Sequence, residues 1–298
     1  MSVLALLLAL LLERGLTHLF HLRELRWLDG YFDRAARVFG GGTGVLKLAG
    51  ALLALLLPVL PVAVIEWLLG SRAHGLPQFG LAVIVLLFSF GPRDLREEVD
   101  DYVAALERGD RDAAAGRATE LLEADAASRG AGVREAVEDA VFVQANNRIF
   151  GVIFWFVLLG AAGAWLFRVS DLMRRRAAFE AGRRGGVARA GAAAALLHGL
   201  LAWIPARLAA FSYALAGSFE DAIGNWRVAV DEAAEKLLDR TEDLLARVGR
   251  GSLGPSLVGL APQSLDAATA RGAWRIVSRA GWIWLSAIAL LVLAGSVA

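Results

Sequence analysis

The stretch IFGVIFWFVLLGAAGAWLF, Ile149 to Phe167, decides the fold class of this sequence. A bilayer hydrocarbon core about 30 Å thick requires roughly 20 apolar residues of helix, because each helical residue adds about 1.5 Å. No charged residue interrupts the stretch, so we interpret it as a membrane-spanning helix. Gly160 and Gly163 lie in its second half and leave a re-entrant course open as the alternative.

The composition of the whole chain agrees with this interpretation. Of its 298 residues, 57% are hydrophobic and 20% charged, and the mean hydropathy is +0.54, which excludes a disordered or an ordinary cytosolic protein. The net charge of +1 gives no reason to expect a nucleic-acid partner. Cysteine is absent, which excludes disulfides, thiolate metal sites and a cysteine nucleophile.

Two further runs are long enough to span a bilayer, residues 45–69 and residues 190–216. Pro58, Pro61 and Pro205 predict kinks in these helices. Shorter runs at 2–12 and 79–90 fit half-spans or re-entrant segments, and 282–298 fits a C-terminal span. We therefore expect an all-α polytopic membrane protein with about four to six membrane segments, some of them short or re-entrant.

The segments between these runs predict a smaller extramembrane helical portion, built from residues 92–145 and 217–280 within a single membrane domain spanning 1–298. Apolar residues recur at helical spacing from residue 95 to residue 106, which predicts an amphipathic helix. The stretch 168–189 holds seven arginines and two acids, and we interpret it as a cytoplasmic loop. The chain is accordingly expected in a membrane, in contact with the lipid bilayer, and the family resemblance given below implies the bacterial inner membrane.

Several polar residues near these runs are candidates for ligand binding. Asn146, Asn147 and Arg148 precede the strongest span and could cap its first turn or hold a phosphate or carboxylate. Glu66 and Arg207 are ionisable residues within apolar runs, where a functional role competes with a structural one. The full set of ligand-binding candidates is Asn146, Asn147, Arg148, Arg168, Pro205, Arg207 and Trp226.

Motifs for metal or nucleotide chemistry are weak. The glycines at 40–44, followed by Lys47, do not meet the GxxxxGK[ST] pattern of a phosphate-binding loop. His18 and His21 share a helical spacing, but no third ligand is placed near them. We therefore expect neither a metal nor a cofactor.

Two blocks of the sequence resemble a known family. QANNRIFGVIFWFVLLGAAGAWLFR at 144–168 and LLHGLLAWIPARLAAFSYALAGSFEDAIGNW at 196–226 resemble AmpE, an inner-membrane protein family linked to cell-wall recycling and β-lactamase induction. That family is in turn similar to the CobD/CbiB enzymes, which attach an aminopropanol arm to the cobyric acid corrinoid. The Trp-Ile-Pro-Ala-Arg-Leu block around Arg207 is the most specific point of contact with both.

Departures from the enzyme pattern suggest lost catalysis. Where those enzymes resemble Glu-Asn-x-x-Asp-Gly, Asn147 and Gly151 match, but Asn146 and Phe150 replace the two carboxylates. His198 stands where the enzymes carry an acid. ATP-driven amide formation needs carboxylates for Mg²⁺ and a general base. The resemblance thus implies a non-catalytic regulatory protein of antibiotic-resistance signalling.

The alternative implied by the same resemblance is a CobD/CbiB-like enzyme of cobalamin biosynthesis with a relocated set of acids. The nearest carboxylates available for it are those of Glu135, Glu138, Asp139, Glu220 and Asp221.

The partners expected for the regulatory protein are an anionic or amphipathic ligand and a protein of cell-wall recycling. Homodimerisation is open as well, since the pairs Gly160 with Ala164 and Ala210 with Ala214 would allow close helix approach.

Overall fold

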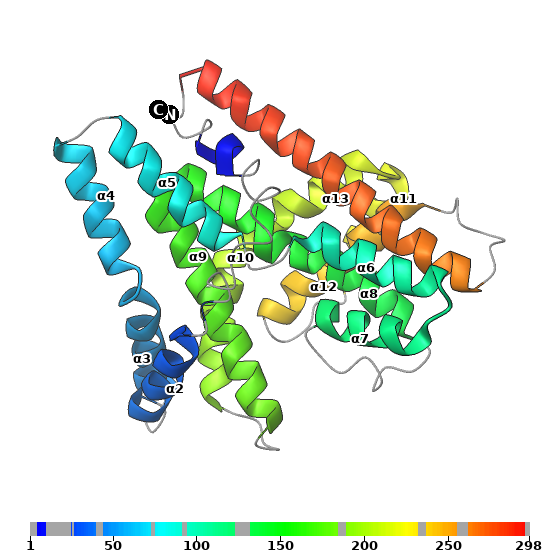
Figure 1. Ribbon diagram of the computed structural model, residues 1–298, viewed down its shortest axis with the longest axis horizontal. Helices are drawn as coiled ribbons and strands as arrows, with labels where there is room; N and C mark the ends of the chain where they lie inside the picture. Colours follow the sequence, from blue (N-terminus) through cyan, green and yellow to red (C-terminus); the bar gives the residue numbers. More distant parts are fainter. Residues whose placement is uncertain are drawn as a thin grey trace.

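Helices account for the whole regular structure of the described chain, as Figure 1 shows. The computed structural model describes residues 5–9, 25, 27–39, 44–72, 75–90, 94–122, 132–183, 189–231, 237–254 and 262–295. Within these ranges there are helices α2 to α13 and one π-helical turn, and no strand. The predicted all-α class is confirmed.

Three helices of the described residues are long and apolar enough to cross a membrane, or up to four with one bent pair. The bent pair joins α3 (Gly44–Leu56) to α4 (Leu60–Arg72) at an angle of 48° near the predicted proline kinks. The helix α5 (Leu76–Ser89) is apolar but shorter. The three long stretches are Val133–Ala181, Gly191–Ala216 and Leu265–Leu293, which contain most of α9 (Gly151–Arg183), α10 (Arg189–Ala216) and α13 (Pro262–Leu293). The chain is thus a multi-pass membrane protein with lipid-facing helices.

The prediction of a loop at 168–189 is wrong in its first part, because α9 is helical without interruption from Ala161 to Arg183. The break in α9 lies earlier, at Gly160, whose φ of 67° and ψ of −153° are not helical. Charged residues can extend a helix when they pair with one another, and this segment does so, as the site below shows.

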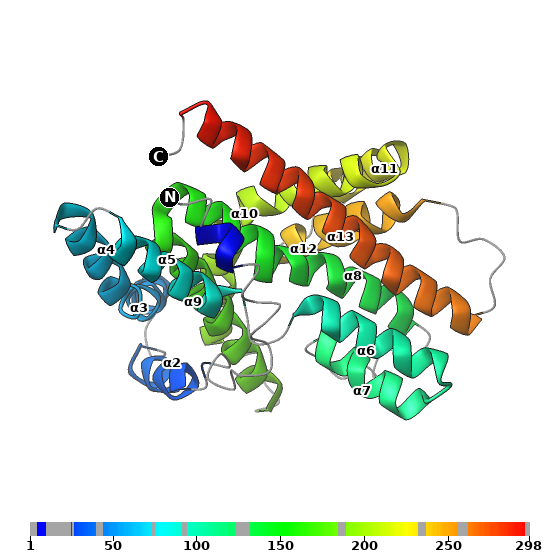
Figure 2. The same cartoon turned by 45° about the horizontal axis from the view of Figure 1, so that its top comes forward.

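Five of the remaining helices form a polar portion that lies together at one end of the molecule in Figure 2. The apolar stripe predicted for 95–106 is confirmed, since Leu95, Val99, Tyr102 and Val103 are buried in α6. The side chain of Asp94 caps α6 by accepting the N–H of Arg96 at 2.9 Å. The helices of this portion are α6 (Leu95–Glu107), α7 (Arg111–Leu122), α8 (Val133–Ala145), α11 (Phe219–Asp231) and α12 (Leu237–Leu253), and α2 (Trp27–Phe39) lies against α3 and α9.

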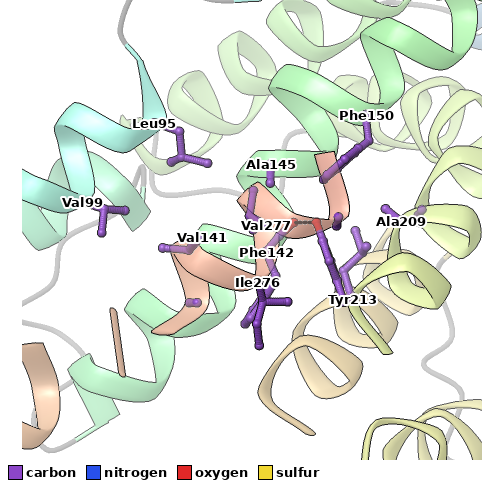
Figure 3. Packing of buried hydrophobic residues seen from close by; sticks show 14 of the residues in the cluster. Leu95, Val99, Val141, Phe142, Ala145, Phe150, Ala209, Tyr213, Ile276 and Val277 are labelled. Atoms are coloured by element: carbon purple, nitrogen blue, oxygen red, sulfur yellow. Dashed lines mark hydrogen bonds between the residues drawn. The ribbon is translucent and has the colours of Figure 1, made fainter. Parts of the chain in front are cut away.

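Aromatic side chains from three helices tie the two portions together (Figure 3). The Tyr213 hydroxyl in α10 donates to the Phe142 carbonyl in α8 at 3.0 Å, and the two rings are packed with centroids 5.0 Å apart. Phe150 contacts both Tyr213 and Trp284 of α13. These buried contacts fix the position of the π-helical turn that carries the candidate site.

The small residues considered for a homodimer are used inside the chain. Ala164, Ala210 and Ala214 are completely buried, and Gly160 lies against Glu66. These pairs therefore pack helices of one chain against each other.

Candidate functional site

A single π-helical turn, η3 (Asn146–Phe150), connects α8 to α9 without a break in the backbone. Asn146, Asn147 and Arg148 are therefore buried within a continuous helical path and do not cap a free helix start. Gly151 follows the turn, and a Cβ at this position would overlap the Phe167 ring, so the close packing requires glycine. Isolated π-helical turns occur frequently at functional sites.

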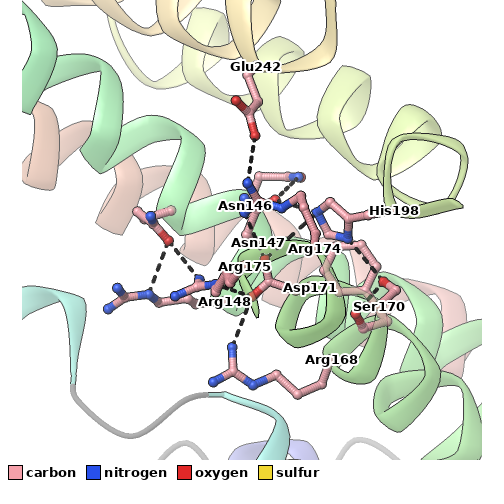
Figure 4. Close-up of polar contacts among 12 residues, drawn as sticks. Asn146, Asn147, Arg148, Arg168, Ser170, Asp171, Arg174, Arg175, His198 and Glu242 are labelled. Carbon is pink, nitrogen blue, oxygen red and sulfur yellow. Dashed lines mark hydrogen bonds and ion pairs between the residues drawn. The ribbon is translucent and has the colours of Figure 1, made fainter. Parts of the chain in front are cut away.

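The completely buried carboxylate of Asp171 is the centre of the polar cluster in Figure 4. Its Oδ1 accepts from Arg174 at 2.9 Å, and its Oδ2 lies 3.1 Å from Arg168 Nη1 and 2.7 Å from Arg175 Nε. One carboxylate thus holds three guanidinium groups in place.

The helix explains this arrangement directly. Arg168, Arg174 and Arg175 are spaced three before, three after and four after Asp171, which places all four side chains on one face of α9. A buried carboxylate requires such compensation, because an isolated charge in the interior is costly.

His198 of α10 connects this carboxylate to the π-helical turn. Its Nε2 lies 3.4 Å from Asn147 Oδ1 and 4.0 Å from Asp171 Oδ1. Its Nδ1 lies 3.0 Å from Ser170 Oγ, which also lies 2.7 Å from the Phe167 carbonyl. His198 is completely buried, so polar groups of α9, α10 and the turn meet in the interior of the protein.

A second buried ion pair holds the turn from the other side. Arg148 donates to Glu98 of α6 at 2.8 Å, with both side chains less than a tenth exposed. Gln144 Oε1 accepts from Arg148 at 3.2 Å and from Arg175 at 3.0 Å. Arg174 also reaches Glu242 of α12 at 3.3 Å, so α6, α8, α9, α10, α12 and the turn all contribute to the cluster.

Four of the predicted ligand-binding residues meet here, namely Asn146, Asn147, Arg148 and Arg168. Arg207 does not join them, since its guanidinium stacks 4.0 Å over the Trp203 ring and donates to the Trp203 carbonyl. Pro205 is buried in α10. Trp226 packs from α11 against the main hydrophobic core. Their proposed ligand-binding role stays a prediction.

The carboxylates considered for the alternative enzyme lie away from this cluster. Asp139 pairs with Arg250 at 2.8 Å, and Arg250 also lies 3.7 Å from Glu135. Glu138 lies 3.7 Å from Arg134, and Asp221 on α11 accepts from Ser218 at 2.6 Å. Glu220 is exposed on α11. The acids that do lie at the cluster are Glu98, Asp171 and Glu242.

Sequence reasoning missed Asp171, His198 and Glu98 as site residues. The arginine spacing around Asp171 was a usable signal, because it surrounds one acid with three bases on one helix face. His18, His21, His74 and the glycines at 40–43 lie outside the described residues.

The fit of a Mg²⁺ ion can be tested on the residues that the structure describes. No group of three or more histidine, aspartate or glutamate side chains is arranged there to hold a metal. Glu98, Asp171 and Glu242 each face an arginine, which competes with a cation for the carboxylate oxygens. The described residues therefore do not fit Mg²⁺, and they suit the binding and orientation of polar or anionic groups.

Comparison with known sequences assigns the family. The family described as CobD/Cbib protein matches residues 5–237, which include the π-helical turn, Asp171 and His198. The chain belongs to the CobD/CbiB family.

Two curated relatives of this CobD/CbiB-family chain are both named cobalamin biosynthesis protein CobD. That of Stutzerimonas stutzeri (strain A1501) is 34% identical over 203 residues, which cover 65% of this chain and 63% of the relative. That of Chromobacterium violaceum (strain ATCC 12472) is 28% identical over 269 residues, covering 85% of this chain and 83% of the relative. The first match thus spans less than two thirds of its relative. No solved structure matches.

These matches correct three expectations. The resemblance to AmpE was the wrong family assignment, because the family match and both relatives are of the CobD/CbiB type. The expected role in β-lactamase induction and cell-wall recycling is wrong for the same reason. The expectation of a non-catalytic protein is also wrong, since the relatives belong to an enzyme family of cobalamin biosynthesis. That expectation relied on acids missing from one motif.

Proposed function

We propose that this CobD/CbiB-family protein is a membrane-embedded enzyme of cobalamin biosynthesis, of the adenosylcobinamide-phosphate synthase type. The reaction joins the amino nitrogen of an aminopropanol arm to a carboxyl carbon of a cobyric acid corrinoid. The new amide C–N bond replaces a carboxyl C–O bond, whose oxygen leaves with the terminal phosphate of ATP, and the amine gives up a proton. The observation that carries the proposal is the family match over residues 5–237. The names of the two relatives support it.

The buried cluster suits the substrates of such a reaction. A corrinoid carboxylate is an anion, and planar guanidinium groups bind carboxylates and phosphates through paired hydrogen bonds. Arg168, Arg174 and Arg175 are held by Asp171 in fixed positions, so their geometry is set before a substrate arrives. His198 lies between Asn147 and Ser170, where an imidazole can exchange a proton with a reacting group.

The location proposed for the reaction is the bacterial inner membrane, with the arginine-rich end of α9 on the cytoplasmic side. The excess of arginine over acid in 168–189 supports this orientation. The corrinoid is the amphipathic ligand that the polar cluster next to apolar helices would accommodate.

Complementation tests the proposal. A bacterial strain lacking its own CobD/CbiB enzyme, grown where cobalamin is required and cobyric acid is supplied, should recover growth when it expresses this chain. Asp171→Asn should reduce recovery at equal membrane abundance, whereas Asp100→Asn on the exposed face of α6 should not. Failure of the wild-type chain to restore growth or form cobinamide, despite membrane insertion, would reject the function.

A further inference from the structure

Two neighbouring amides in the π-helical turn each carry one buried polar atom without a partner. Asn146 Oδ1 and Asn147 Nδ2 make no hydrogen bond, although the two residues are only 0% and 2% exposed. Buried polar atoms are nearly always paired, because an unpaired one costs the desolvation of the group. Two such atoms on adjacent side chains therefore indicate a position where a ligand group binds.

The chemistry of the pair does not depend on how the amide groups are assigned. Asn146 Nδ2 donates to Asn147 Oδ1 at 3.3 Å, which requires one nitrogen and one oxygen to face each other. Exchanging oxygen and nitrogen in both side chains preserves that bond, and exchanging them in only one side chain destroys it. Either consistent assignment leaves one unpaired donor and one unpaired acceptor.

This donor and acceptor select against simple ions. A metal cation would face the unpaired N–H, and a carboxylate would face the unpaired carbonyl oxygen, so each meets one repulsive partner. A carboxamide meets neither, because its carbonyl accepts and its N–H donates. His198 and Asp171 lie next to the pair, which places a proton-exchanging group and a charge beside this position.

We infer that Asn146 and Asn147 bind the carboxamide formed in the proposed reaction, one side chain holding its carbonyl oxygen and the other its N–H. The inference rests on the proposed function, since that reaction makes a secondary amide from a corrinoid carboxyl and an amine. It replaces the anionic group expected for these residues with a neutral one.

Corrinoid binding to the full chain in nanodiscs tests the inference independently of turnover. Cobinamide, which carries the amide, and cobyric acid, which carries the free carboxylate, are each titrated by isothermal calorimetry. The ratio of cobinamide affinity to cobyric acid affinity should be about tenfold higher in the wild type than in a variant without the pair, the effect of one to two hydrogen bonds. Asn146→Ala and Asn147→Ala should each lower this ratio about tenfold, because the acceptor or the donor is lost, whereas the arginines are unchanged.

The matched control is Asn225→Ala, because Asn225 is a partly exposed asparagine on α11 that donates to the Asp221 carbonyl and lies outside the cluster. This variant should keep the wild-type ratio. Thermal unfolding of each variant shows whether it is folded.

Each other outcome has a distinct meaning. An unchanged ratio in folded Asn146→Ala and Asn147→Ala overturns the inference and leaves the function standing. A side-chain-resolution map of the cobinamide complex in which a bridging water is the only occupant of the Asn146 and Asn147 pair overturns it as well and needs no variant. Failure of the wild type to bind either corrinoid rejects the proposed function together with the inference.

Discussion

The carboxylate of Glu66 accepts a hydrogen bond of 2.8 Å from the backbone N–H of Ala161. Its second oxygen accepts from the next backbone N–H, that of Ala162, also at 2.8 Å. Both N–H groups lack helical partners because α9 is broken at Gly160. The negative charge of Glu66 thus lies at the start of the second half of α9, where the helix dipole favours an anion.

The two broken membrane helices satisfy each other's backbone groups. The bend between α3 and α4 contributes the Pro58 carbonyl, which accepts from Trp165 Nε1 of α9 at 3.0 Å. The break in α9 contributes the two N–H groups that Glu66 of α4 accepts. In a bilayer such groups have no water to bond, so each break is stable only in the presence of the other.

Replacing Glu66 by alanine should therefore destabilise the protein. We expect a loss of about 2 to 3 kcal/mol, the value of hydrogen bonds to a charged acceptor. Thermal unfolding of the purified protein in detergent measures the loss. Glu97→Ala, on the exposed face of α6, is the control and should change stability little. Equal melting temperatures for Glu66→Ala and Glu97→Ala would contradict the capping role.

Gly160→Ala should be harmful for two reasons. The backbone at Gly160 has a positive φ, which costs about 1 to 3 kcal/mol for a residue with a Cβ. The added Cβ would also overlap the Glu66 carboxylate. Gly80→Ala in α5 is the matched control, because nothing lies within 4 Å of its Cβ position. That control should leave stability equal or slightly higher. A neutral Gly160→Ala would show that α9 is straight in solution.

The parts of the fold that sequence predicted are those governed by local pattern. The stripe from Leu95 to Val103 lies within one helix, and hydrophobic periodicity was sufficient to find it. The contact of Glu66 with Ala161 joins residues 95 apart in the sequence. No local pattern contains such a contact, because it depends on two breaks that meet only in three dimensions.

The candidate site was predicted in part for the same reason. Asn147 and Arg168 were found because they flank the strongest span, but the carboxylate that connects them was sought in the wrong motif. Asp171 lies in a segment that was interpreted as a loop from its charge alone. The spacing of the arginines around it, three or four residues away, is typical of one helix face, whereas a count of charges does not distinguish a helix from a loop.

Asp171→Asn should destabilise the protein strongly. It leaves Arg168, Arg174 and Arg175 close together without their shared anion, which typically costs about 3 to 5 kcal/mol for a buried pair. Chemical unfolding in detergent, followed by tryptophan fluorescence, measures the loss. Asp100→Asn removes an exposed ion pair with Arg96 and should cost less than about 1 kcal/mol. If both variants behaved alike, Asp171 would not be the anion that holds the arginines.

The protein should lose stability at alkaline pH because of the buried hydroxyl of Tyr102. Burial, with the charges of Asp266 and Glu138, raises the pKa of its hydroxyl from 10.0 to about 12. The folded protein therefore keeps a proton that the unfolded chain loses above pH 10, so stability falls as pH rises from about 10 towards 12. Tyr102→Phe lacks this term, and its stability relative to wild type should improve over that range. Melting temperatures of both proteins from pH 9 to 11 test this, and a constant difference would contradict it.

Trp155 and Pro205 should be energetically coupled. Pro205 has no N–H, so the Leu201 carbonyl one turn earlier in α10 loses its helical donor, and Trp155 Nε1 of α9 donates to it at 2.9 Å. Pro205→Ala restores the missing N–H. Trp155→Phe should then lower the free energy of unfolding less in the Pro205→Ala background than in the wild type, by about 0.5 to 1.5 kcal/mol, the value of one hydrogen bond.

A double-mutant cycle from unfolding free energies removes the packing changes of the single variants. Trp165→Phe is the control, because its acceptor is the Pro58 carbonyl and its effect should add to that of Pro205→Ala. Additive behaviour of Trp155→Phe as well would mean that the Leu201 carbonyl gains nothing from the indole.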